Sequence, residues 1–123
     1  MSAERVVVEI RGLEAFGRHG VFEEERRLGQ RFVVDVALEL SQAAAAHTDD
    51  LADTVDYAAL AADVAAIVEG EPVALLERLA GLVADRCLEE PHAAAVTVTV
   101  RKPHVAVPQT LESTGATLHR SRA

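Results

Sequence analysis

The sequence predicts an α+β domain in which a four-stranded, largely antiparallel sheet carries two helices on one face. Two segments near each end of the chain place apolar residues at every second position, whereas the middle places them at helical spacing. The order is therefore two strands, two helices and two strands, and packing both helices on one face is the simplest layering. The 123 residues contain no repeat or linker, so we expect one domain over residues 1–123.

The clearest predicted strand is residues 31–40, where one side carries Phe32, Val34, Val36, Leu38 and Leu40. Residues 5–11 alternate in the same way, and Gly12 then breaks or bulges the strand. Near the other end of the chain, residues 95–102 alternate between valine and polar side chains, and residues 111–120 form a weaker last strand.

Two predicted helices fill the middle of the chain. The first starts at Tyr57, after a cap from Thr54 or Asp56, and Gly70 is well placed to end it. In the second, Pro72 fits the first turn. An apolar stripe then follows along this helix, formed by Leu76, Leu79, Ala80, Val83 and Cys87.

Composition excludes several classes of function. A formal net charge of −8 argues against nucleic acid, whose phosphates attract clustered Lys and Arg. The chain has neither a run of about 18 apolar residues nor a basic, then apolar, N-terminal region, so we expect no membrane span, no secretory signal and a cytoplasmic location. The single cysteine, Cys87, agrees with a reducing compartment, and its place on an apolar stripe favours a core position over a reactive thiol.

Metal and cofactor motifs are not evident. The five histidines show no paired spacing and there is no second cysteine, which makes a zinc site improbable. A phosphate loop, a dinucleotide fingerprint and a nucleophile elbow are also missing from the sequence. The residues therefore predict no metal site and offer no motif for a phosphate-bearing or dinucleotide cofactor.

Self-association is favoured by the size of the chain. A domain this short has little room for an internal ligand cavity, so a pocket for a bicyclic ligand is built more economically between subunits. Unpaired edge strands on so small a sheet would also promote aggregation, and edge-to-edge assembly into a ring would remove them.

Lys102 is the first candidate for chemistry, because the strand alternation puts it on the same face as the valines that precede it. Burial of an ammonium group favours its neutral form, which suits a general acid or base. The alternative is a lysine at a strand end whose charged group reaches water.

Glu77 and Tyr57 are further candidates. Helical spacing aligns Glu77 with the small residues Gly81 and Ala84, which leaves room for a flat ligand. The N–H groups of such a ligand would pair with the carboxylate. The alternative is a glutamate at a helix edge that bends to solvent. Tyr57 is the only tyrosine, and its hydroxyl could relay a proton or its ring could simply pack on the core. The acidic run at residues 23–25 reads as a solvated loop or first helical turn from which one carboxylate can turn inward.

Five ordered blocks together carry a specific resemblance. They are GRHGVFEEE at 17–25, LGQRF at 28–32, DDLADTVDY at 49–57, LLERLA at 75–80 and VRKP at 100–103, with Val107 and Pro108 downstream. In this order they resemble the dihydroneopterin aldolase family over about residues 6–120. The resemblance implies the tunnelling fold, a β-β-α-α-β-β subunit assembled into a ring of four or an octamer of two stacked rings, with active sites between subunits.

The resemblance also implies a reaction. A carbon–carbon lyase of folate biosynthesis would split 7,8-dihydroneopterin by a retro-aldol reaction into 6-hydroxymethyl-7,8-dihydropterin and glycolaldehyde. No cofactor would be needed, since the pterin's own C=N system accepts the electrons. By position, Lys102 matches the family's proton donor and acceptor, Tyr57 the residue that helps protonate the enol intermediate, and Glu25 the carboxylate that holds the lysine and binds the polyol tail.

Substrate-binding residues follow from the same blocks. Glu77 matches the anchor for the pterin's ring N–H and exocyclic amino group, with the backbone beside Leu76 also in contact. Thr54 and Val55 would be presented with Tyr57 by the neighbouring subunit. The resemblance also implies 7,8-dihydroneopterin epimerase as a side activity, and an oxygenase activity that depends on Tyr57 can accompany it. The alternatives are a dihydroneopterin triphosphate epimerase and a non-catalytic pterin-binding ring protein. The net charge disfavours the triphosphate, and a mere binder has little use for the lysine and the tyrosine.

Overall fold

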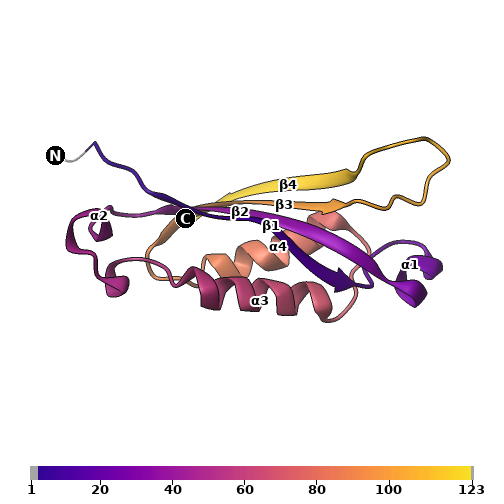
Figure 1. The fold of residues 1–123 in the computed structure, drawn as a ribbon, viewed down its shortest axis with the longest axis horizontal. Helices are drawn as coiled ribbons and strands as arrows, with labels where there is room; N and C mark the ends of the chain where they lie inside the picture. The colour runs from indigo at the N-terminus through magenta and orange to yellow at the C-terminus, as the bar shows by residue number, and fades with distance from the viewer. Residues whose placement is uncertain (1–2, 123) are drawn as a thin grey trace.

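A computed structural model describes residues 3–122, and it has the predicted α+β architecture: an antiparallel sheet with two long helices on one face (Figure 1). The four strands are β1 (Val7–Gly17), β2 (Gln30–Leu40), β3 (Ala93–Lys102) and β4 (Thr114–Ser121), and they lie side by side in chain order. The long helices are α3 (Tyr57–Glu69) and α4 (Leu76–Cys87). Three short elements accompany them: α1 (Glu23–Leu28), α2 (Ala45–Thr48) and the 3-10 turn η1 (Leu51–Asp53).

The core lies between the sheet and the two long helices. The sheet contributes the inward side chains of its central strands, namely Phe32, Val34, Val36, Leu38, Val96, Val98 and Val100. The helices contribute Leu60, Val64, Val68, Leu79, Ala80, Val83, Ala84 and Cys87. These are the faces that the alternation and the helical spacing predict, and Cys87 lies in the core as expected.

Strand β1 is longer than expected because Gly12 bulges the strand without ending it. The register of β1 against β2 shifts between Ile10 and Leu13, and Gly12 has a φ of 70°. Its N–H donates to Oδ1 of Asp35 at 2.6 Å, so the bulge is anchored to the neighbouring strand. Strand β4, in contrast, begins at Thr114 and not at residue 111.

Helix α3 begins and ends as the sequence predicts. Asp56 is the cap, with Oδ1 accepting from the N–H groups of Ala58 at 3.1 Å and Ala59 at 3.2 Å, and the N–H of Gly70 donates to the carbonyl of Ile67.

The expected role of Pro72 in the first turn of the second helix is wrong, because α4 begins only at Leu76. The segment before α4 is instead tied to the loop that follows β1. The N–H of Gly20 donates to the carbonyl of Val73 at 2.9 Å, and the N–H of Val73 donates to Nδ1 of His19 at 3.0 Å. These bonds replace the helical hydrogen bonds that an earlier start would have formed.

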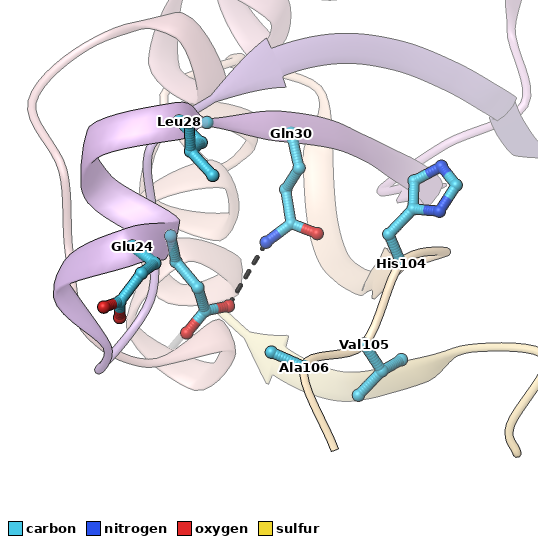
Figure 2. Close-up of a pocket in the computed structure, with 8 residues that line it drawn as sticks. Glu24, Leu28, Gln30, His104, Val105 and Ala106 are labelled. Carbon is cyan, nitrogen blue, oxygen red and sulfur yellow. Dashed lines mark hydrogen bonds between the residues drawn. The ribbon is translucent and has the colours of Figure 1, made fainter. Parts of the chain in front are cut away.

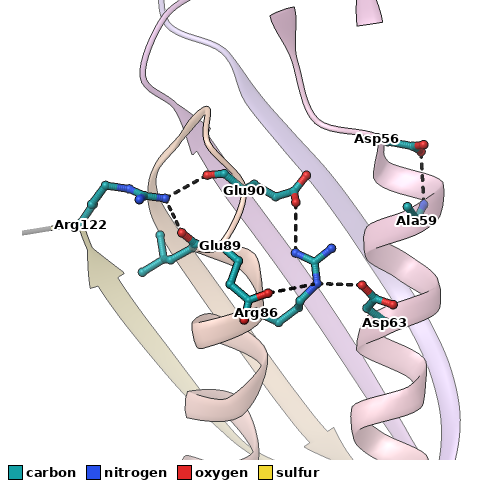
Figure 3. A network of polar contacts seen from close by, with 8 residues as sticks. Asp56, Ala59, Asp63, Arg86, Glu89, Glu90 and Arg122 are labelled. Carbon is teal, nitrogen blue, oxygen red and sulfur yellow. Dashed lines mark hydrogen bonds and ion pairs between the residues drawn. The ribbon is translucent and has the colours of Figure 1, made fainter. Parts of the chain in front are cut away.

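Arg86 holds the two long helices together (Figure 3). Its side chain donates from α4 to Asp63 of α3 at 2.8 Å and to Glu90 at 3.1 Å. Arg122 closes the end of α4 by donating to the carbonyls of Leu88, Glu90 and Ala93. None of the helices within residues 3–122 has the length and apolar character needed to cross a bilayer.

Candidate active site

Lys102 and Glu25 form an ion pair at one end of the sheet. Lys102 is the last residue of β3 and Glu25 belongs to the first turn of α1, and Nζ of the lysine lies 2.6 Å from Oε2 of the glutamate. Their side chains are 16% and 7% exposed. The lysine is therefore held at the end of the valine row by a carboxylate, and its amine is not free in solvent.

Glu25 is the one glutamate of the acidic run that turns inward. Its Oε1 accepts from the backbone N–H of Phe22 at 3.3 Å, and its Oε2 accepts from Nε2 of Gln30 at 3.2 Å. Gly20 allows this position, because a Cβ atom there would lie 2.5 Å from the Glu25 carboxyl carbon. Loop, helix and strand thus combine to aim one carboxylate at Lys102.

The environment of Glu25 keeps it ionised. Burial alone would raise the pKa of the carboxyl, but hydrogen bonds from Lys102 and Phe22, the charge of Lys102 and the hydrogen bond from Gln30 outweigh burial. The pKa of Glu25 is therefore lowered from its ordinary value. A carboxylate that stays charged beside an amine can orient that amine and accept hydrogen bonds from a ligand.

A pocket of about 260 Å³ opens beside this pair (Figure 2). It lies between α1, the start of β2 and the segment that follows β3. Its lining residues are Glu24, Glu25, Leu28, Gly29, Gln30, His104, Val105 and Ala106. Apolar walls around a few polar groups are typical of small-molecule sites.

Glu77 and Leu76 form the first turn of α4, at the same end of the molecule as Lys102. The segment before this turn is bonded to His19 and Gly20, and Gly20 lies against Glu25. Glu77 is exposed, whereas Gly81 and Ala84, with which helical spacing aligns it, are buried. The cap residue Leu75 makes no side-chain hydrogen bond to the first turn of α4.

Tyr57, Thr54 and Val55 lie at the other end. Tyr57 opens α3 and is 65% exposed, whereas Val68, near the end of the same helix, accepts a hydrogen bond from His19 at 2.6 Å. Eleven positions of helix separate Tyr57 from Val68, or about 16 Å. Within one chain, therefore, Tyr57 lies too far from Lys102 to share a site with it. Thr54 lines a separate hollow of about 230 Å³, and Val55 is buried in the core.

Comparison with known proteins assigns the chain to a family. The family model described as dihydroneopterin aldolase matches residues 8–119. The chain belongs to the dihydroneopterin aldolase family. It is 46% identical over 115 residues to dihydroneopterin aldolase of Streptomyces coelicolor, covering 94% of this chain and 97% of that protein. Identity with the Bacillus subtilis enzyme of the same name is 42% over 117 residues, covering 94% and 98%.

A solved structure of a family member shares the fold. It is the E. coli dihydroneopterin aldolase in complex with neopterin, which superposes with a TM-score of 0.81 at 30% identity and covers 94% of this chain and 99% of that one. The tunnelling fold that the resemblance implies is thus the fold of this chain.

Two residues of the family blocks at 17–25 and 28–32 are recognised as supporting the site only from their three-dimensional contacts. His19 is 1% exposed and bridges the end of α3 to the segment before α4, and Gln30 bonds directly to Glu25. Neither residue stands out from the pattern of the sequence, where the only signal is its place in a block that resembles the family. Among residues 3–122 no cluster of three or more His, Cys, Asp or Glu side chains could hold a metal ion.

Proposed function

We propose that this chain is a dihydroneopterin aldolase, which cleaves 7,8-dihydroneopterin into 6-hydroxymethyl-7,8-dihydropterin and glycolaldehyde in folate biosynthesis. The observation that carries the proposal is the Lys102–Glu25 pair beside a pocket, in a chain of this family. The names of the relatives and the neopterin in the E. coli structure support the substrate class.

The proposed reaction begins at a hydroxyl group of the substrate's side chain. Lys102 in its neutral form, acting through water, accepts the hydroxyl proton, and the oxygen's electrons form the carbonyl of glycolaldehyde as the carbon–carbon bond breaks. The bonding pair flows into the pterin C=N system and gives an enol-type intermediate, so neither a metal nor an organic cofactor is required. Tyr57 then helps to return a proton to the side-chain carbon that remains on the ring.

Glu77 and Leu76 are proposed to hold the pterin ring. The Glu77 carboxylate would accept the ring N–H and the exocyclic amino group as a pair, and the backbone beside Leu76 would bond to the ring. Their position at the same end as Lys102, together with a first turn of α4 that has no side-chain cap, supports this assignment. Glu25 would hold Lys102 and bind the polyol tail.

We further propose that the active site is shared between subunits of a homo-oligomer, either a ring of four or an octamer of two stacked rings. Tyr57 lies too far from Lys102 along its own chain, so a neighbouring copy would present it together with Thr54 and Val55. Strands β1 and β4 are the outer strands of the sheet, and edge-to-edge pairing would join them between copies. The proposed place of action is the cytoplasm.

Epimerisation of dihydroneopterin is a proposed side activity, because the intermediate can reclose on its other face. The pocket disfavours a triphosphate as substrate, since its lining contributes Glu24 and Glu25 and no basic residue other than His104. A non-catalytic binder would have no need for the partly buried amine of Lys102.

The proposal is tested by incubating the protein with 7,8-dihydroneopterin, with and without oxygen, and separating the products. Glycolaldehyde with 6-hydroxymethyl-7,8-dihydropterin is the expected result under both conditions. Formation of monapterin alone would assign an epimerase instead, oxygen-dependent pterin products would indicate an oxygenase, and no conversion would leave a binding protein.

A further inference from the structure

His19 is a buried histidine that the proposed reaction does not use. It is 1% exposed, and its ring packs against the ring of Phe32 in an edge-on arrangement. Its Nε2 lies 2.6 Å from the carbonyl oxygen of Val68 in α3, and its Nδ1 lies 3.0 Å from the backbone nitrogen of Val73. Because a carbonyl only accepts and a backbone N–H only donates, Nε2 carries the proton and Nδ1 is the acceptor.

Val73 lies three residues before the first turn of α4, and both of its backbone polar groups bond to the loop after β1. Its N–H donates to His19, and its carbonyl accepts from the N–H of Gly20 at 2.9 Å. Figure 1 shows the segment between α3 and α4 beside the end of β1. The two bonds tie the chain just before Leu76 and Glu77 to this loop.

The same loop also contacts the proton-transfer pair. Gly20 lies against Glu25, where a Cβ atom would come within 2.5 Å of the carboxyl carbon, and Glu25 holds Lys102. His19 and Gly20 are neighbours in the chain, so one short stretch of backbone is in contact with both parts of the site. The bonds of this stretch determine how far apart those parts lie.

We infer that His19 is a positioning residue, which through its bond to Val73 sets the distance between the first turn of α4 and the Lys102–Glu25 pair. The inference rests on the proposed function, in which that turn holds the pterin ring and Lys102 acts at the side-chain hydroxyl. A ring held at the wrong distance still binds, but its hydroxyl no longer lies where the lysine can take the proton. Because a misplacement of about 1 Å can lower a rate about a hundredfold, His19 acts on turnover and not on affinity.

The test separates the two ring nitrogens of His19. In His19→Asn the amide oxygen can take the place of Nδ1 and accept from Val73, whereas the bond to Val68 and much of the contact with Phe32 are lost. In His19→Gln the longer amide can donate to Val68 in place of Nε2, whereas Val73 loses its acceptor. His19→Asn should be the less stable variant, because it leaves the larger cavity.

Turnover should follow the opposite order. The kcat for 7,8-dihydroneopterin should fall about tenfold or more in His19→Gln and stay near the unmodified value in His19→Asn, while both variants bind the unreactive 6-hydroxymethylpterin almost as the unmodified protein does. His119→Gln is the matched control, since His119 is exposed on β4 and bonds to Thr97. A kcat that is equal in the two His19 variants or lower in His19→Asn would overturn the inference, as would weakened 6-hydroxymethylpterin binding by His19→Gln.

A measurement on the unmodified protein decides the matter if a variant folds poorly. In ¹⁵N NMR spectra His19 should be protonated at Nε2 and not at Nδ1, and the amide hydrogen of Val73 should exchange slowly with solvent. A proton on Nδ1 or rapid exchange at Val73 would overturn the inference, because the bond between them would then be absent. Failure of the unmodified protein to convert 7,8-dihydroneopterin would instead refute the proposed function.

Discussion

The Nζ of Lys102 lies 2.6 Å from Oε2 of Glu25, although 77 positions of sequence separate the two residues. The lysine arrives at the end of β3 and the glutamate on the first turn of α1, and both side chains are largely withdrawn from water. Because burial disfavours an isolated charge, each residue depends on the other to stay in this place.

Removing the lysine should change the titration of its partner. In Lys102→Met the hydrogen bond and the positive charge beside Glu25 disappear while burial remains, so the pKa of Glu25 should rise above its value in the unmodified protein. The measurement is a ¹³C NMR titration of the Glu25 carboxyl carbon. Arg101→Met serves as control, since Arg101 pairs with Asp35 and not with Glu25. An unchanged Glu25 pKa in Lys102→Met would show that the pair does not form in solution.

Stability should depend on pH through Glu25. Its pKa in the folded chain is lowered from an ordinary value of 4.5, so the ionised carboxylate stabilises the fold above that value, and this contribution is lost as the pH falls through the lowered pKa. Near neutral pH, the free energies of unfolding in urea of the unmodified protein and of Glu25→Gln should therefore differ by a constant amount. As the pH falls below 4.5, the free energy of unfolding of the unmodified protein should decrease relative to that of Glu25→Gln. A difference that grows with acid would contradict this sign.

Gly20 and Gly12 provide a matched pair of substitutions. A Cβ at Gly20 would lie 2.5 Å from the Glu25 carboxyl carbon, so Gly20→Ala should displace the carboxylate and lower kcat/KM by about a hundredfold. At Gly12, where φ is 70°, a Cβ meets no atom within 4 Å. Gly12→Ala should cost about 1 kcal/mol of stability through backbone strain and leave kcat/KM unchanged. Equal activity of the two variants would mean that Glu25 tolerates displacement.

The thiol of Cys87 should be unreactive in the folded protein. Burial raises the pKa of its thiol to about 11, and its side chain is 0% exposed. Because the thiolate is the reactive form, a thiol reagent at neutral pH should label Cys87 only after denaturant is added. Rapid labelling without denaturant would show that α4 opens readily.

The patterns of the sequence predict the sheet and the core well, because alternation and helical spacing report which side of an element is buried. They predict Lys102 on the buried side of β3 for the same reason. They do not predict which loops contact one another in the folded chain. The position of Pro72 relative to α4 depends on the bonds that His19 and Gly20 make to Val73, and these bonds join residues more than fifty positions apart.

The sequence likewise indicates some residues of the candidate site and leaves others to be found from the fold. Alternation marks Lys102 and the acidic run marks a group that includes Glu25, but only the fold selects which of three adjacent glutamates turns inward. Gln30 carries no local signal, since its role arises from contact with Glu25 across the end of α1. The exposure of Tyr57 and Glu77 in a single chain shows a further limit. Their proposed roles require a partner surface or a ligand that a single-chain pattern does not encode.

The most direct test of the account is the rate at which Lys102→Ala releases glycolaldehyde from 7,8-dihydroneopterin in a single turnover. Loss of a general acid–base group should slow this step by about a hundredfold or more, while binding of 6-hydroxymethylpterin stays largely intact and Arg101→Ala behaves like the unmodified protein. Release of glycolaldehyde by Lys102→Ala at the unmodified rate would contradict the central claim that this lysine transfers the proton.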